Sequence, residues 1–222
     1  MIIAIFDLDG TLYTGHITRG LARHHLTHRV KRMWVYFYLG THMPIWWLSR
    51  AGLMSEAAMR ELWSRHIGWM VRGWTPPEAT RAFAWVAEQY VKPRVRSDVM
   101  ARLQSHQDSG HRVILVSGTM APLLEQIGRQ LGVSETVGTP LVVRNGRYNG
   151  VSQLPVCQGR HKVTRLEAHL GGGEQNFWPQ SYAYADSYTD LPLLERVGHP
   201  VAVFPDDKLA AHAKVHGWEV IN

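Results

Sequence analysis

Three short apolar runs, each ending in a small polar residue, dominate the hydrophobic pattern of the chain: Ile2–Phe6 before Asp7, Val113–Val116 before Ser117, and Tyr182–Ala185 before Asp186. Continuous apolar runs of this length are typical of strands buried on both faces of a parallel sheet. Helical patterns separate them, at Asp98–Gln107, Met120–Leu131 and Lys162–Leu170. The alternation predicts an α/β fold with a doubly wound, Rossmann-like parallel sheet. Because ligands bind beyond the carboxyl ends of such strands, we expect the three polar residues to converge.

Two further patterns extend this core. Residues Leu141–Tyr148 read as a hairpin that turns at Asn145-Gly146, a strong signal for a two-residue turn. Near the end of the chain, the pattern predicts a strand, a helix and a short last strand, at Val201–Phe204, Lys208–His216 and Trp218–Ile221.

Between the first strand and the rest of the sheet, the pattern changes to helical spacing. Pro44 and Thr75-Pro76-Pro77 are expected to act as breaks, which leaves roughly four helices. We therefore predict a helical cap domain at residues 14–93, inserted into a discontinuous catalytic core formed by residues 1–13 and 94–222. This division assigns the polar ends of the strands to the core and leaves the insert to cover them.

Charge and tryptophan are concentrated in the insert. The chain of 222 residues carries a formal net charge of +6, but residues 14–93 hold 11 Lys and Arg against 4 Asp and Glu, and the remainder has a net charge of −1. Seven of the nine tryptophans also lie there. A basic cap suits an anionic substrate. We expect no nucleic-acid partner, because the aromatic residues of the insert fit a core or a lipid contact better, and keep a non-enzymatic nucleic-acid-binding module as the less favoured alternative.

The single cysteine, Cys157, excludes a disulfide framework and fits a reducing compartment. The first residues, Met1–Asp7, lack the pattern of a secretory signal. Both observations predict a cytoplasmic protein. The sequence contains no signal for its oligomeric state.

Asp7 and Asp9 carry the strongest chemical signal. Two carboxylates two residues apart, where a buried strand meets Gly10, can face one pocket. Like charges that close do not both ionise easily unless a cation neutralises them or one keeps its proton. The pattern therefore suits a site where one aspartate binds Mg²⁺ and attacks while the other transfers a proton. An ordinary Asx turn is the structural alternative.

With these residues the chain resembles the haloacid dehalogenase-like phosphatases. That family places Asp-x-Asp-Gly-Thr after its first strand, as in Asp7–Thr11 here, and later a strand ending in Ser or Thr, as at Ser117. A lysine opening a helix matches Lys162, and Asp-x-x-x-Asp matches Asp186 and Asp190. The helical insert between the first two motifs makes the chain most similar to the phosphoserine-phosphatase-like branch.

The resemblance implies a role for each matching residue. Asp7 would attack phosphorus and form an aspartyl-phosphate, and Asp9 would protonate the leaving alcohol and then activate water. Mg²⁺ would be held by Asp7, the backbone carbonyl of Asp9 and Asp186. Ser117 and the Gly118 amide would bind phosphate, Lys162 would balance its charge, and Asp190 would hold Lys162 or a metal-bound water, with Thr11 as a supporting residue.

The cap is expected to choose the substrate. Phosphoserine phosphatases use a cap glutamate nine residues past the nucleophile, where this chain has His16. A histidine offers no fixed negative charge to an ammonium group, which argues against phosphoserine itself. Arg19 and Arg23 are further candidates for contact with a phosphorylated small molecule, and the sequence leaves Arg50, Arg60 and Arg65 of the cap open as alternatives. The aromatic stretch Met33–Leu48, next to basic residues, also resembles the bacterial phosphatidylglycerophosphatase C type. The alternative function is therefore a phosphatase that acts on a lipid head group, with peripheral contact to the anionic inner membrane surface. The other interpretation of the stretch is a buried seam of the cap or a dimer contact.

Three histidines of the cap, His24, His25 and His28, have helical spacing. Their spacing permits metal binding, but a solvated basic helix face is the favoured interpretation.

Overall fold

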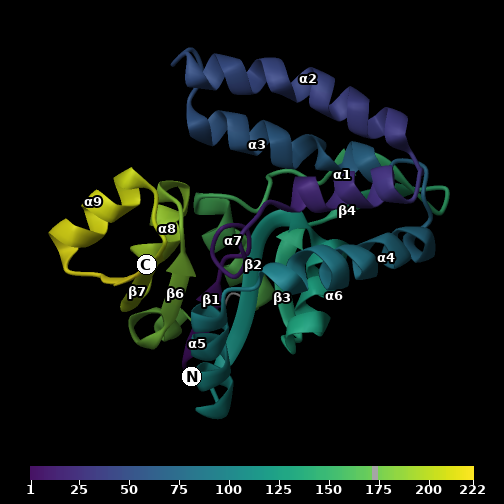
Figure 1. The fold of residues 1–222 in the computed structure, drawn as a ribbon. Coiled ribbons are helices and arrows are strands. Elements are labelled where there is room, and N and C mark those ends of the chain that lie inside the picture. The colour runs from purple at the N-terminus through teal and green to yellow at the C-terminus, as the bar shows by residue number, and fades with distance from the viewer. Residues whose placement is uncertain (172–174) are drawn as a thin grey trace.

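The computed structural model describes residues 1–171 and 175–222, and Figure 1 shows the arrangement of their elements. Six strands form one parallel sheet in the order β3-β2-β1-β6-β7-β8, and β4 and β5 form a separate antiparallel hairpin. The strands are β1 Ile3–Phe6, β2 Arg112–Met120, β3 Glu135–Thr139, β4 Leu141–Arg144, β5 Arg147–Ser152, β6 Tyr182–Ala185, β7 His199–Val203 and β8 Glu219–Ile221.

Helices cover both faces of this sheet and form a layer beyond its carboxyl edge (Figure 1). The α-helices are α1 Ile17–Thr27, α2 Arg32–Arg50, α3 Glu56–His66, α4 Pro76–Trp85, α5 Ser97–Asp108, α6 Ala121–Leu131, α7 Arg160–His169, α8 Leu191–Leu194 and α9 Asp207–His216. Shorter helical turns are η1 Ile67–Val71, η2 Val86–Val91, η3 Lys92–Arg94, η4 Gln175–Gln180 and η5 Tyr188–Asp190.

The alternation of side chains along β1 shows why the sheet is doubly wound. Ala4 and Phe6 belong to one hydrophobic core with α5 and α6, whereas Ile3 and Ile5 belong to a second core with α7, α8 and α9. A strand that buries both faces must be apolar at every position, which is the pattern of this run. The predicted fold class is confirmed.

The strand register brings the chemical residues to one edge. Phe6 pairs with Leu115 of β2 and with Tyr184 of β6, and the Asp7 amide donates a 2.9 Å hydrogen bond to the Tyr184 carbonyl. Ser117, in β2, and Asp186, directly after β6, therefore lie two residues beyond these pairs, on the two sides of β1. Their convergence follows from a parallel register with β1 in the middle.

The hairpin prediction is confirmed, since Asn145 and Gly146 both have positive φ, of 51° and 71°, between β4 and β5. The break expected at Thr75-Pro76-Pro77 is also present, because Thr75 begins α4 in a capping box with Glu78. The break expected at Pro44 is wrong: α2 runs from Arg32 to Arg50 through it. Pro44 has no N–H to donate to the Gly40 carbonyl, so α2 continues without that one backbone hydrogen bond, held by its packing against α1, α3 and η1.

In the insert, α2 is the outermost helix, and α3 lies between α2 and the sheet (Figure 1). Helix α1 contacts α2, α4 and η1, whereas α4 and η2 pack against α6 of the core. None of the helices in the described ranges is both long and apolar enough to cross a membrane. The division into core and cap domains remains a prediction.

Candidate active site

The turn after β1 presents Asp7 and Asp9 on different sides. Gly10 has a φ of +86°, and a Cβ there would lie 2.1 Å from Oδ2 of Asp186. Only glycine fits this conformation and lets the Asp186 carboxylate come so close. Thr11, two residues after Asp9, donates from its hydroxyl to Asp7 Oδ2 at 3.2 Å and to Asp186 Oδ1 at 3.3 Å.

Lys162, in the first turn of α7, joins two of the aspartates. Its Nζ donates to Asp7 Oδ1 at 2.5 Å and to Asp190 Oδ2 at 2.8 Å, and the lysine side chain is only 3% exposed. Burial lowers the pKa of this ammonium, but the charges of Asp190 and Asp7 outweigh the burial and raise its pKa overall. Lys162 is therefore a fixed positive charge beside the Asp7 carboxylate.

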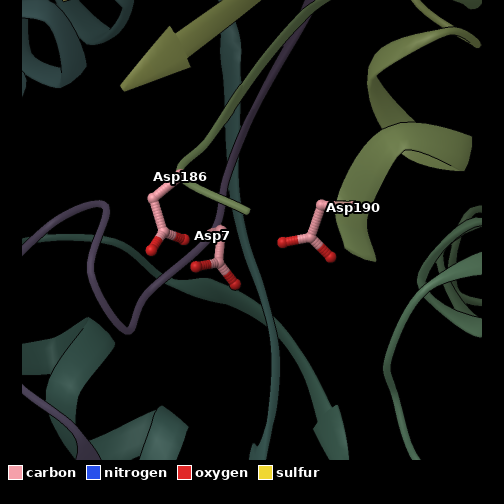
Figure 2. A group of neighbouring side chains, drawn as sticks. All are labelled: Asp7, Asp186 and Asp190. Atoms are coloured by element: carbon pink, nitrogen blue, oxygen red, sulfur yellow. The ribbon is translucent and has the colours of Figure 1, made fainter. Parts of the chain in front are cut away.

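Asp7, Asp186 and Asp190 point toward a common space (Figure 2). One oxygen from each lies within 4.8 Å of the others, and Oδ1 of buried Asp190 has no hydrogen-bond partner among the residues that the structure describes. Burial, followed by the charges of Asp7 and Asp190, raises the pKa of Asp186 to about 8. This concentration of hard oxygen ligands fits Mg²⁺, which would relieve the mutual repulsion of the carboxylates.

Asp9 turns away from this group toward the cap. Its Oδ1 accepts a 2.5 Å hydrogen bond from the Tyr13 hydroxyl, and the backbone amide of Ile17, at the start of α1, donates to both carboxylate oxygens at 3.2 Å. Burial raises the pKa of Asp9 to about 7; the Tyr13 hydrogen bond opposes this effect, and the charge of Asp7 adds to it. At neutral pH this carboxyl can both give and take a proton.

Ser117, Gly118 and Thr119 lie where β2 shifts its register against β3, between Val116 and Met120. The Thr119 amide donates to Ser117 Oγ at 3.2 Å, and the Thr119 hydroxyl is buried with no hydrogen-bond partner in the described ranges. All three residues line the cavity that also contains Asp7. The sequence placed Ser117 at the strand end, but β2 continues to Met120, and α6 begins at Ala121.

A cavity of about 880 Å³ extends from the aspartates into the cap. The three cap candidates from the sequence, His16, Arg19 and Arg23, all line it, on the face of α1 and its N-cap. Burial, and next the charge of Arg19, lower the pKa of His16. A neutral imidazole at this position offers no fixed charge to a substrate.

The structure brings two further residues to the site: Tyr13, which the sequence did not indicate, and Arg60, one of five cap arginines among which the sequence did not choose. Tyr13 contacts Asp9, and its position two residues after Thr11 gave no local signal. Arg60 of α3 lines the cavity; burial lowers its pKa, but Glu56 and then Asp186 and Asp190 outweigh the burial and raise it. Helical spacing across α3 was the available signal for Arg60, but only the folded chain shows which face meets the core.

The favoured interpretation of the cap histidines is wrong for two of the three. His24 and His25 are 8% and 0% exposed and pack against Trp74, whereas His28 is exposed. Burial, and then His25, lower the pKa of His24 to about 4, so this ring behaves as a packed aromatic group. Both rings help to anchor α1 on η1 and α4.

The family model of the haloacid dehalogenase-like hydrolases matches residues 4–195. A phosphoserine phosphatase of Mycobacterium tuberculosis is 29% identical over 222 residues, covering 98% of this chain and 69% of that protein. A histidinol-phosphatase of Neisseria meningitidis is 34% identical over 139 residues, covering 60% of this chain and 62% of the relative. A probable phosphatase of M. tuberculosis is 31% identical over 71% of this chain, but the match spans only 54% of that protein.

Solved structures share the fold. A protein of unknown function from Bordetella pertussis has a TM-score of 0.83 at 24% identity, covering 99% of this chain and 97% of its own. A phosphoserine phosphatase in its apo form has a TM-score of 0.63 at 15% identity, covering 99% and 92%. With its family match, parallel sheet and aspartate cluster, the chain belongs to the haloacid dehalogenase-like hydrolases.

Proposed function

We propose that the protein hydrolyses the phosphomonoester of a small molecule through an aspartyl-phosphate on Asp7, with Mg²⁺ as cofactor. The observation that carries the proposal is the arrangement of the aspartates: Asp7 lies between Lys162 and Asp186, while Asp9 stands apart with a pKa of about 7. Each carboxylate has the environment that its step requires.

In the first step an Asp7 oxygen attacks phosphorus, and the bond from phosphorus to the alcohol oxygen breaks. The leaving oxygen takes the Asp9 proton, so a neutral alcohol departs. In the second step water attacks phosphorus and gives a proton to Asp9, while the bond from phosphorus to Asp7 breaks. Inorganic phosphate leaves, and both aspartates return to their starting states.

The other residues bind and orient. Lys162, fixed by Asp7 and Asp190, balances the charge of the phosphoryl group. The Ser117 hydroxyl and the Gly118 amide, in the neighbouring strand β2, bind its oxygens. Asp7, Asp186 and the Asp9 carbonyl would hold Mg²⁺, with Asp190 as an additional carboxylate beside it. When bound, the ion withdraws charge from the phosphoryl oxygens.

The cap residues His16, Arg19 and Arg23 are proposed to contact the remainder of the substrate, because they line the same cavity. Two relatives have names that specify phosphoserine and histidinol phosphate, which makes both compounds reasonable members of a substrate panel. A lipid phosphate at the membrane surface remains the second candidate, since Met33, Tyr36 and Trp47 of α2 are exposed beside basic residues. We place the protein in the cytoplasm.

Asp7→Asn tests the proposal. The variant keeps the shape of the side chain but lacks the nucleophilic carboxylate, and we expect turnover of p-nitrophenyl phosphate with Mg²⁺ to fall at least 1,000-fold, about 4 kcal/mol of barrier. Asp108→Asn, at the exposed end of α5, is the matched control and should retain wild-type rates. Robust turnover by Asp7→Asn would show that this carboxylate is not the nucleophile.

A further inference from the structure

The cavity that contains the aspartates continues between α1, α2 and α3, and we call this part of the cavity the arm. Further along these helices the wall is mostly hydrophobic, with Arg23 and Thr27 of α1 beside the apolar side chains, which are Ala22, Leu26, Leu39, Met43, Trp46 and Trp63. The total volume of about 880 Å³ is in the upper part of the range, roughly 300–1,000 Å³, that encloses drug-sized ligands. A phosphate on a three-carbon alcohol leaves most of this space unused.

The arm begins at the catalytic end and leads outward. The Ile17 amide is bonded to Asp9, so the start of α1 is at the reacting centre. Leu26 is nine residues further along the same helix, about 14 Å away at 1.5 Å per residue. Leu26 and Met43 are 41% and 42% exposed, so the far end of the arm opens to solvent. The cavity therefore runs from the aspartates to a mouth between α1 and α2.

Most of the charged side chains on this path lie toward its inner end. His16, Arg19 and Arg60 lie on the wall of the inner half, and Arg60 interacts electrostatically with Asp186 and Asp190. Arg23 lies further out on α1, beside Ala22. Glu56 lines the wall but is engaged by Arg60 at 2.8 Å. An occupant with an anionic head and an apolar remainder matches this order of side chains, whereas a zwitterionic amino acid finds no free carboxylate in the cap part of the cavity wall that the structure describes.

We infer that the alcohol released by this enzyme carries an apolar group, alkyl or aryl, that lies in the arm between α1, α2 and α3. The inference rests on the proposed function, since it names the class of phosphomonoester that the same site takes. Its physical basis is the transfer of apolar surface from water, about 0.8 kcal/mol for each fully buried methylene. Affinity should therefore depend on the length of the alcohol until the arm is filled.

The test is a series of monoalkyl phosphates from butyl to decyl, each below its micellar concentration, with phenyl and naphthyl phosphate as the aryl arm. Phosphate release is measured with Mg²⁺, and p-nitrophenyl phosphate reports on the chemistry. For wild-type protein kcat/KM should rise about two- to fourfold for each added methylene, the factor for half to full burial of that group, and then level off. A corresponding rise from phenyl to naphthyl would identify a ring as the occupant.

Two adjacent tryptophans supply a matched pair of variants. Trp46 lines the arm, whereas its neighbour Trp47 is 63% exposed and lies outside the cavity wall. Trp46→Gln should lower kcat/KM for octyl phosphate by about 4- to 12-fold, half of the burial free energy of a large side chain, and should flatten the series. Trp47→Gln should follow the wild-type series. Met43→Gln, at a partly exposed position of α2, provides a second probe of the arm with little risk to folding.

Binding gives a readout that does not need turnover. Alkylphosphonates, which cannot be hydrolysed, should quench tryptophan fluorescence with an affinity that increases along the same series. A flat series in both turnover and binding overturns the inference, and if p-nitrophenyl phosphate is still hydrolysed, the proposed function stands. If no phosphate is hydrolysed although binding increases with chain length, the apolar site stands and the proposed function fails.

Discussion

Tyr13→Phe changes the proton affinity of Asp9 without removing any group that touches phosphate. The Tyr13 hydroxyl donates a 2.5 Å hydrogen bond to Asp9 Oδ1, and this bond lowers a pKa that burial otherwise raises. A hydrogen bond to a charged group contributes about 1.5–3 kcal/mol, and one to a neutral group about 0.5–1.5 kcal/mol. Their difference of about 1–1.5 kcal/mol corresponds to roughly one pKa unit. We therefore expect the pKa of Asp9 to rise from about 7 to about 8 in the variant.

The sign of the kinetic effect follows from the role of Asp9. The first step needs the protonated carboxyl, so kcat/KM should fall above a pH of about 7 in the wild-type protein. In Tyr13→Phe this descending limb should move about one unit toward alkaline pH. The acidic limb contains the second ionisation of the substrate phosphate, near pH 6, and should not move.

The assay is kcat/KM for an alkyl phosphate from pH 5 to 10, because a poor leaving alcohol depends on protonation. p-Nitrophenyl phosphate, whose leaving group is stable as an anion, should show a weaker alkaline limb. Tyr90→Phe is the matched control, since the Tyr90 ring packs edge-on against Tyr13 with centroids 6.3 Å apart. An unmoved or acid-shifted descending limb in Tyr13→Phe would refute Asp9 as the proton donor.

Three further predictions concern other parts of the site. Gly10→Ala should lose at least 100-fold in kcat/KM, because its Cβ would meet the Asp186 carboxylate at 2.1 Å. Gly146→Ala is the control, since Gly146 also has a positive φ but no atom of the described chain lies within 4 Å of a Cβ there. Its free energy of unfolding in urea should fall by only about 1 kcal/mol, and its activity should be unchanged. Mg²⁺ should raise the melting temperature, measured by scanning fluorimetry against an EDTA control, more at pH 8 than at pH 6. Burial retains a proton on Asp186, with a pKa of about 8, and this proton competes with the ion at the lower pH. An equal rise in melting temperature at both pH values would contradict this. Lys162→Met should lower kcat/KM at least 100-fold, which is the usual cost of removing a preorganised group that stabilises charge in an enzyme active site. The control Lys208→Met, at the exposed start of α9, should have the kcat/KM of the wild-type protein.

The raised pKa of Asp186 also sets the direction of stability against pH without metal. A carboxyl whose pKa is higher in the folded state binds its proton more tightly there, so its contribution to stability is full below its unfolded pKa, near 3.8, and is lost as the pH rises through about 8. The free energy of unfolding of the metal-free protein should therefore decline across this window, as measured by urea titration. Asp186→Asn should reduce the decline.

The sheet was predictable because burial on both faces leaves a simple mark. Ile2–Phe6 has no polar position, and only a strand in the middle of a doubly wound sheet requires that pattern. The turn at Asn145-Gly146 was predictable for an equally local reason, since both residues accept positive φ. The convergence of Asp7 and Asp186 followed from parallel strand order.

Several details of the cap could not be predicted, because they depend on contacts between segments that are distant in the sequence. His24 and His25 read as charged, but Trp74 approaches them from a distant part of the chain and buries them. Pro44 reads as a helix break, but α2 packs against α1, α3 and η1, which lie elsewhere in the chain, and runs through this residue. Which face of α2 and α3 borders the cavity depends on how both helices dock onto the core, and the hydrophobic pattern alone does not encode this docking.

The most direct test of the central claim is to trap the phosphoryl group on Asp7. Asp9→Asn should slow the second step more than the first with p-nitrophenyl phosphate, so that acid quenching in the steady state leaves a phosphorylated protein. Mass spectrometry should then show an added phosphoryl group on the peptide containing Asp7, labile to hydroxylamine, and absent when Asp7→Asn is added. Steady turnover with an unmodified Asp7 at every quench time, or a label on another residue, would contradict the mechanism.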